Sequence, residues 1–111
     1  MNETSALRNE IKYLEKSLIK HKQQLLKSLL SDFKLSKDTL IKINSQPDKL
    51  YILTDYYLEF VDDCGEYLLK LLLCDFDSIN NIINHQDNLK VTIYTPLHFN
   101  SHFIIIDKHT I

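Results

Sequence analysis

Residues 7–33 have the sequence LRNEIKYLEKSLIKHKQQLLKSLLSDF, which contains neither glycine nor proline. The first apolar residues of this stretch follow a four-three-four spacing, at Leu7, Ile11, Leu14 and Leu18. That spacing is typical of the seam of a coiled coil. After a polar break at residues 21–24 the apolar stripe becomes broader, at Leu25, Leu26, Leu29, Leu30 and Phe33, as in a helix that packs on a core. The stretch therefore predicts one long helix with two different faces.

The predicted helix begins near Asn2 or Thr4, because either side chain can cap free backbone N–H groups. It ends between Leu30 and Leu35, where serine and aspartate side chains compete with the helix for backbone hydrogen bonds. A helix of this length spans about 45 Å, whereas a compact body of this size is about 30 Å across. The helix is therefore expected to project beyond the rest of the chain.

A chain of 111 residues fits a single domain. We expect residues 1–34 to form the long helix, with its N-terminal half overhanging, and residues 35–111 to form the body. No segment approaches the ~20 consecutive apolar residues of a membrane span, and the first residues lack a basic region followed by an apolar run. The expectation is a cytoplasmic protein without a membrane partner.

Alternating apolar residues and turn-forming residues predict a sheet after the helix. Residues 50–61 and 66–73 predict two strands, joined by a hairpin turn at residues 62–65 that holds the only glycine. A helical hairpin is the alternative, because leucine-rich runs also fit helices. Residues 39–44 fit a short strand or a helical turn equally well, and residues 45–48 predict a turn.

The last part of the chain predicts two more strands and a short helix. The helix is expected to start at Asp75 or Asp77, to run through Ile83, where the apolar spacing of three and four returns, and to end near residues 85–88. Strands are predicted at residues 89–95 and 103–107, with a loop at residues 97–101. The predicted fold class is α+β, with a long N-terminal helix followed by a four- or five-stranded antiparallel sheet and one short inserted helix.

The sequence favours neither a catalytic centre nor a metal site. His98 and His102 are four residues apart, but the predicted loop would hold them on one face only loosely, and a zinc site completed by Asp107 or His109 is the alternative. Acidic residues gather around the predicted hairpin turn, where a solvated surface explains them. The two cysteines fit free thiols. We expect no catalytic residue, no metal, no cofactor and no enzymatic activity.

Four basic residues are spaced four apart on the predicted helix, at Arg8, Lys12, Lys16 and Lys20. This basic ridge could bind an anionic partner, either a nucleic-acid backbone or an acidic protein surface. Nucleic acid is disfavoured by the net charge of −2 and by the presence of a single arginine. A solvated helix face is the simplest explanation of the ridge.

The seam formed by Leu7, Ile11, Leu14 and Leu18 needs a cover, because soluble proteins rarely leave such a stripe exposed. A second copy of the chain is the simplest cover, through a short coiled coil. A parallel pair would place Glu10 opposite Glu15, whereas an antiparallel pair can place Arg8 opposite Glu15. Charge therefore slightly favours the antiparallel homodimer.

These observations predict a small non-enzymatic protein–protein interaction module, homodimeric through its first helix, that binds or inhibits a macromolecular partner. In size and composition it is similar to the small inhibitors and adaptors of phages and mobile elements. Lysine outnumbers arginine twelve to one, which suggests the AT-rich coding sequence of a low-GC bacterium or its phage. The alternative is a nucleic-acid-binding or transcriptional regulatory protein that uses the basic ridge.

Overall fold

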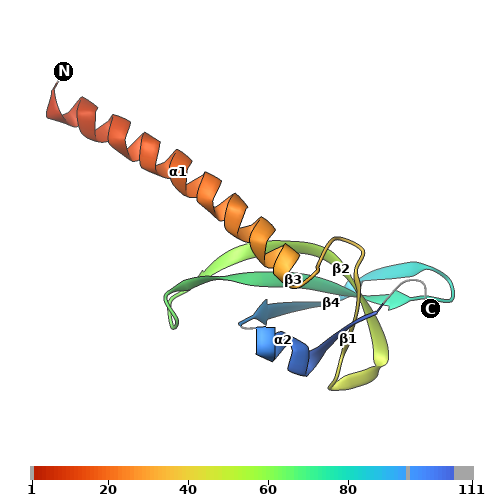
Figure 1. Cartoon of the computed structure of the whole chain (residues 1–111). Coiled ribbons are helices and arrows are strands. Elements are labelled where there is room, and N and C mark those ends of the chain that lie inside the picture. Colours follow the sequence, from red (N-terminus) through yellow and green to blue (C-terminus); the bar gives the residue numbers. More distant parts are fainter. Residues whose placement is uncertain (1, 95, 107–111) are drawn as a thin grey trace.

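The computed structural model describes residues 2–94 and 96–106 and shows an α+β fold, as the sequence predicted (Figure 1). Its elements are α1 (Glu3–Asp32), β1 (Leu40–Ile43), β2 (Gln46–Val61), β3 (Glu66–Asp77), β4 (Ile82–Ile93), α2 (Pro96–His102) and β5 (Phe103–Ile106). The five strands form one antiparallel sheet in the order β4-β3-β2-β1-β5. Thr95, Asp107 and His109, which entered the predictions above, lie outside the described residues.

Both ends of α1 have a local cause. The Asn2 side chain accepts a hydrogen bond from the Ser5 backbone N–H at 2.8 Å, which caps the first turn. At the other end Lys34 adopts a positive φ of 56°, and the Leu35 N–H donates to the Leu30 carbonyl at 2.8 Å. This six-to-one bond is the mark of a Schellman motif. The predicted start and end of the helix are confirmed.

The hairpin of β2 and β3 has a four-residue turn at residues 62–65, and Gly65 takes a positive φ of 67° there. The sequence prediction of a β-hairpin is confirmed, and the helical alternative is wrong. The undecided segment at residues 39–44 contains strand β1. The turn predicted at residues 45–48 is misplaced, because the chain reverses at residues 44–45 and β2 already begins at Gln46.

The short helix predicted from Asp75 or Asp77 is wrong. Strand β3 continues to Asp77, and the chain turns at residues 78–81 into β4. Asp77 Oδ1 accepts hydrogen bonds from the backbone N–H groups of Ile79 and Asn80, so this carboxylate caps a turn instead of a helix. Ile79 is 92 % exposed at the turn, so the apolar spacing in which it takes part does not correspond to the buried face of a helix.

The loop predicted at residues 97–101 is also wrong, since these residues belong to α2. Phe99 explains why this helix forms where it does. Its ring is buried and lies 5.2 Å from the Phe33 ring and 5.3 Å from the Phe103 ring, measured between centroids. The inserted short helix therefore exists, but tertiary packing places it after β4.

The main core lies on one face of the sheet, under α2 and the last turns of α1. Its most buried members are Ile41, Leu53, Leu69, Leu71 and Leu73, each at most 1 % exposed. From α1 only Leu26, Leu29 and Leu30 join this core, followed by Phe33, the residue directly after the helix. A smaller cluster on the other face holds Leu40, Ile52 and Cys74. Cys74 is buried and Cys64 is exposed, and both are free thiols, as expected.

Candidate functional site

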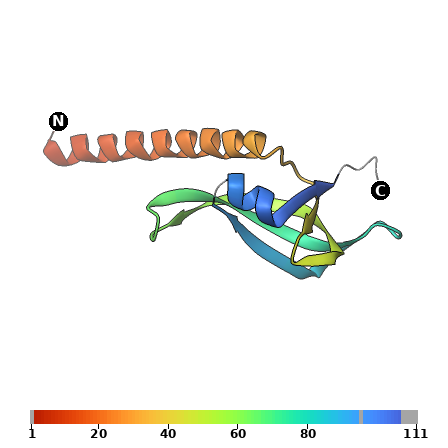
Figure 2. The same cartoon turned by 60° about the horizontal axis from the view of Figure 1, so that its bottom comes forward.

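Little more than the last three turns of α1 pack on the body, and the rest of the helix projects from it. The body covers the C-terminal part of α1, whereas the N-terminal half extends past the end of the β2–β3 hairpin (Figures 1 and 2). The whole molecule accordingly measures 65 × 28 × 24 Å. A projecting helix of this kind exposes every side of its surface to solvent, so its sequence pattern is free to serve an interaction.

The seam predicted from the sequence lies on this projecting half. Its side chains are 52 % (Leu7), 54 % (Ile11), 56 % (Leu14) and 47 % (Leu18) exposed. A side chain on a lone helix is already shielded in part by its own helix, so these values mean that no other element in the described part of the chain covers the seam. Four uncovered aliphatic side chains in a row are the kind of surface that binds a partner.

The seam ends at His21, because the next position of the coiled-coil spacing after Leu18 holds this histidine and no apolar residue. The imidazole Nδ1 lies 2.7 Å from the Ser17 carbonyl oxygen and 3.3 Å from the Ser17 hydroxyl. The ring thus folds back onto the preceding helical turn and adds no apolar surface. The polar break seen in the sequence is therefore a physical end of the stripe.

The seam and the docking side of α1 point in different directions. At about 100° of rotation per residue, the mean direction of the seam is turned by about 80° around the helix axis from the mean direction of Leu26, Leu29, Leu30 and Phe33. Leu25 follows the direction of the seam and is 38 % exposed. The sequence placed Leu25 in the core stripe, but the structure places it at the border between the seam and the body.

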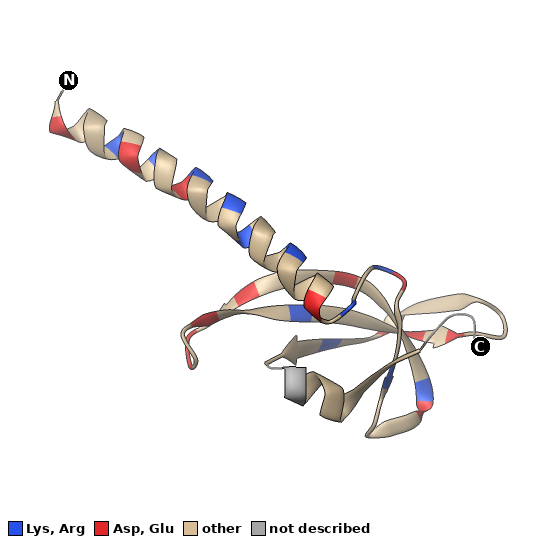
Figure 3. Cartoon of the chain, viewed as in Figure 1, with Lys and Arg blue, Asp and Glu red and all other residues tan. Residues whose placement is uncertain are grey.

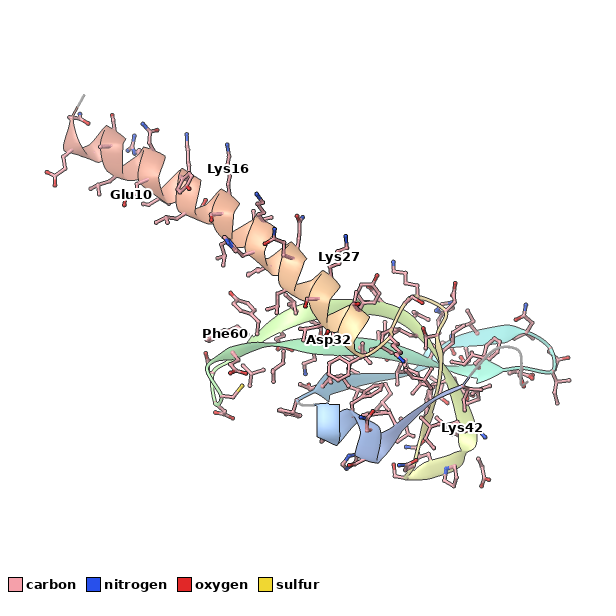
Figure 4. All side chains as sticks on the ribbon, viewed as in Figure 1. Glu10, Lys16, Lys27, Asp32, Lys42 and Phe60 are labelled. Carbon is pink, nitrogen blue, oxygen red and sulfur yellow. The ribbon has the colours of Figure 1, made fainter. Side chains whose placement is uncertain are left out.

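The basic ridge is exposed along its whole length. Lys16 points away from the sheet (Figure 4), and the lysines form a blue row along α1 in Figure 3. Within residues 2–94 and 96–106, none of Arg8, Lys12, Lys16 and Lys20 forms an ion pair. Lys12, Lys16 and Lys20 lie on the side of α1 away from the seam, and Arg8 flanks the seam.

A groove between α1 and the sheet is a site that sequence reasoning missed. It has a volume of about 430 Å³ and runs between the last turns of α1 and strands β3 and β4. Phe33, Leu69 and Ile93 form its floor, and all three are buried. The groove joins residues more than fifty positions apart in the chain, so no local pattern could reveal it.

The walls of the groove are apolar and its charged residues are acidic. Leu25 of α1, Tyr67 of β3 and Tyr94 line its sides, and Tyr94 is 56 % exposed. Asp32 and Glu66 supply the charged groups. Beyond Tyr67 the apolar surface continues onto Phe60, whose ring meets the Tyr67 ring edge-on at 5.2 Å and points toward α1 (Figure 4).

The histidines predicted to lie in a loop instead lie on α2. The rings of His98 and His102 stack with centroids 4.5 Å apart and planes inclined by 28°. The His102 Nδ1 atom lies 2.9 Å from the His98 carbonyl oxygen, so this nitrogen donates to the backbone. Rings stacked in this way do not converge on a common point, and the described residues contain no group of three side chains suited to hold a metal ion.

The acidic residues around the hairpin turn form no common site either. Asp62 and Asp63 are exposed in the turn, and Glu59 pairs with Lys70 at 3.3 Å. Figure 3 shows the red turn at the end of the β2–β3 hairpin. These carboxylates give the hairpin a negative tip.

Comparison of the chain with protein-family models, with curated proteins and with solved structures finds no match in any of the three. Among the described residues, no helix is long and apolar enough to cross a membrane. The surfaces from which a function can be argued are the exposed seam of α1, the basic ridge on the same helix and the groove beside the seam.

Proposed function

We propose that this protein is a small non-enzymatic interaction module that forms a homodimer through the N-terminal half of α1. The single observation behind the proposal is the exposed seam, in which Leu7, Ile11, Leu14 and Leu18 follow coiled-coil spacing on a helix that projects from the body. A second copy supplies the matching stripe, because an isologous contact pairs the same surface with itself.

An antiparallel arrangement fits the seam best. It places Leu7 against Leu18 of the second copy and Ile11 against Leu14, and symmetry repeats both layers. Arg8 then lies near Glu15 of the second copy, and the two-fold symmetry repeats this contact. In the parallel arrangement Glu10 would face Glu15, so like charges would meet. The antiparallel pair also keeps the two bodies at opposite ends of the coiled coil.

The energy of this contact is modest. Full burial of a leucine or isoleucine stabilises by about 1.5–3 kcal/mol, and each seam side chain is already about half shielded by its own helix. Eight such side chains thus contribute on the order of 10 kcal/mol before the cost of association, which takes about 4 kcal/mol or more of it. We expect dissociation in the micromolar range, suited to regulated assembly.

The body is proposed to bind or inhibit a macromolecular partner in the cytoplasm, in the manner of phage or mobile-element inhibitors and adaptors. The uneven charge supports a binding role, because the chain carries a net +4 up to Lys49 and a net −6 from Leu50 onward. A surface with two signs of charge can select and orient a complementary partner.

Sedimentation equilibrium tests the dimer. The molar mass is expected to rise from that of one chain to that of two as the concentration passes through tens of micromolar. A single-chain mass at all these concentrations would exclude self-association through the seam. The mass of a stable trimer or tetramer would contradict the antiparallel pair.

Nucleic-acid binding is the second candidate, and one observation favours it. The basic ridge is fully solvent-exposed and is not neutralised by ion pairs within the described chain. A phosphate backbone could release counterions on binding such a row of lysines. A titration against a nonspecific DNA duplex at low and moderate salt tests this candidate, since its affinity must fall steeply with salt.

A further inference from the structure

We propose that the groove between α1 and strands β3 and β4 binds an amphipathic, lysine- or arginine-bearing helix of a partner protein. The inference deepens the proposed function, because it rests on the role of the chain as an interaction module and names the chemistry of its target. The groove lies outside the four-residue seam, so one molecule can pair with its own copy and hold a target at the same time.

The shape of the groove suits a peptide segment. Its floor of Phe33, Leu69 and Ile93 is sealed by the core, so the groove is a fixed depression in a packed surface. Leu25 and Tyr94 on its sides stay well exposed and present apolar surface to a ligand. An apolar helix face laid in such a groove buries these side chains, which is a common mode of peptide recognition.

The groove is also continuous with an exposed apolar surface at each side. Leu25 lies in the direction of the seam, and Phe60 extends the aromatic surface beyond Tyr67. A groove that opens into flanking apolar surface favours a helix several turns long over a compact small molecule, because the helix covers the flanks as well as the floor. Figure 4 shows Phe60 below α1 and Asp32 at the C-terminal end of α1.

Charge selects the partner. The charged residues that line the groove are Asp32 and Glu66, both exposed carboxylates. Asp62 and Asp63 lie beyond the groove, in the turn that precedes Glu66. A helix with lysine or arginine beside its apolar face would meet the carboxylates of Asp32 and Glu66, whereas an acidic helix would be repelled. Lys22 brings one positive charge to the wall of the groove, because its Nζ lies 4.7 Å from the centroid of the Tyr67 ring, and the two lining carboxylates outnumber it.

Binding of two synthetic peptides to the full chain tests the proposal. Each peptide has about 18 residues, enough to form an isolated helix, and carries leucine on one face. The other face carries lysine in the first peptide and glutamate in the second. Fluorescence anisotropy is expected to give an affinity at least about tenfold higher for the leucine–lysine peptide. Equal binding of both, or binding of neither, would overturn the proposal.

Variants locate the site. Tyr94→Ala is expected to weaken binding of the leucine–lysine peptide by about tenfold. Tyr57→Ala is the control, because Tyr57 is an exposed tyrosine on the other face of the sheet, and it leaves binding unchanged.

Asp32→Lys combined with Glu66→Lys is expected to reverse the preference toward the leucine–glutamate peptide. Asp48→Lys combined with Asp55→Lys makes the same change in net charge away from the groove and preserves the preference. Loss of preference in this control would mean nonspecific attraction and would overturn the proposal.

Two other occupants give different results. If the groove takes the second copy, Tyr94→Ala lowers the molar mass in sedimentation. If it takes a small apolar molecule, the dye Nile red binds in a Tyr94-dependent way and neither peptide does. Each result overturns the proposal. A chain that is monomeric but still prefers the leucine–lysine peptide refutes the dimer alone, so the two proposals fail separately.

Discussion

The Nζ atom of Lys22 lies 4.7 Å from the centroid of the Tyr67 ring, and this contact marks where α1 leaves the body. A cation over an aromatic ring contributes about 0.5–1 kcal/mol at an exposed site. Residues after Lys22 pack on the sheet, and residues before it project from the body. The contact divides α1 into a part that belongs to the fold and a part that is free for assembly.

Replacing Leu14 and Leu18 by aspartate is expected to abolish the dimer. Each leucine contacts the second copy in the proposed pair, so the double variant loses four apolar contacts and adds four buried charges. The dissociation constant should rise by at least about 100-fold, measured by sedimentation equilibrium. Tyr13→Asp is the control, because Tyr13 is exposed on the same helix but off the seam. An unchanged molar mass in the double variant would refute the seam as the interface.

Reversing the charge of Lys12, Lys16 and Lys20 to glutamate is expected to leave the molar mass unchanged, because these side chains point away from the seam. The wild-type chain is expected to bind a nonspecific duplex no more tightly than about millimolar at low salt, since its net charge is negative. Tighter binding that the triple variant abolishes, with the dimer intact, would favour the nucleic-acid function instead.

Ile41→Ala is expected to lower the free energy of unfolding by about 2–5 kcal/mol, because its side chain is fully buried in the main core. Ile79→Ala removes the same atoms at a turn where the side chain is 92 % exposed, and it should change stability by less than about 0.5 kcal/mol. Urea denaturation measures both. Similar losses for the two variants would mean that the turn at residues 78–81 is buried by a partner.

Gly65→Ala is expected to destabilise the chain by about 1–2 kcal/mol, because Gly65 has a φ of 67°. A methyl group at this position meets no atom within 4 Å, so the cost comes from the backbone alone. Gly65→Asn should cost less, since asparagine tolerates the left-handed region. Thermal denaturation compares the two, and a neutral alanine variant would contradict the turn geometry.

The Asp77 carboxylate should stabilise the β3–β4 turn in a pH-dependent way. Hydrogen bonds from the Asn80 side chain, and then from the Asn80 and Ile79 backbone, lower the pKa of Asp77 below its usual 3.8. Because the folded-state pKa is depressed, the stabilisation is present above pH 3.8 and is lost as the pH falls through the folded-state pKa.

Asn80→Ala should move the pKa of Asp77 back toward 3.8, measured by NMR titration of the carboxyl carbon. Its effect on stability should shrink as the pH is lowered through this range. Asn100→Ala, an exposed asparagine on α2, serves as the control and should leave the pKa of Asp77 where it is. An unchanged pKa in Asn80→Ala would show that the side-chain hydrogen bond is not the main cause.

Local sequence determined the elements whose pattern repeats over many residues. The heptad spacing and the absence of glycine and proline specified α1, and Asn2 and the residues around Leu35 specified its ends. Alternation and the lone glycine specified the β2–β3 hairpin. In each case neighbours in the sequence are also neighbours in space, so the pattern and the structure carry the same information.

Tertiary structure decided the rest. Whether residues 78–83 form a helix, or a turn followed by the start of a strand, depended on the pairing of β3 with β4. Helix α2 formed because Phe99 could pack against Phe33 and Phe103. The position of Leu25 at the border of the seam, and the groove that it shares with Tyr67 and Tyr94, required residues from both ends of the chain to meet. The sequence by itself determined the projecting seam, because a helix fixes its own faces. Only the fold could show what lies beside that seam, because contacts between distant segments leave no periodic trace.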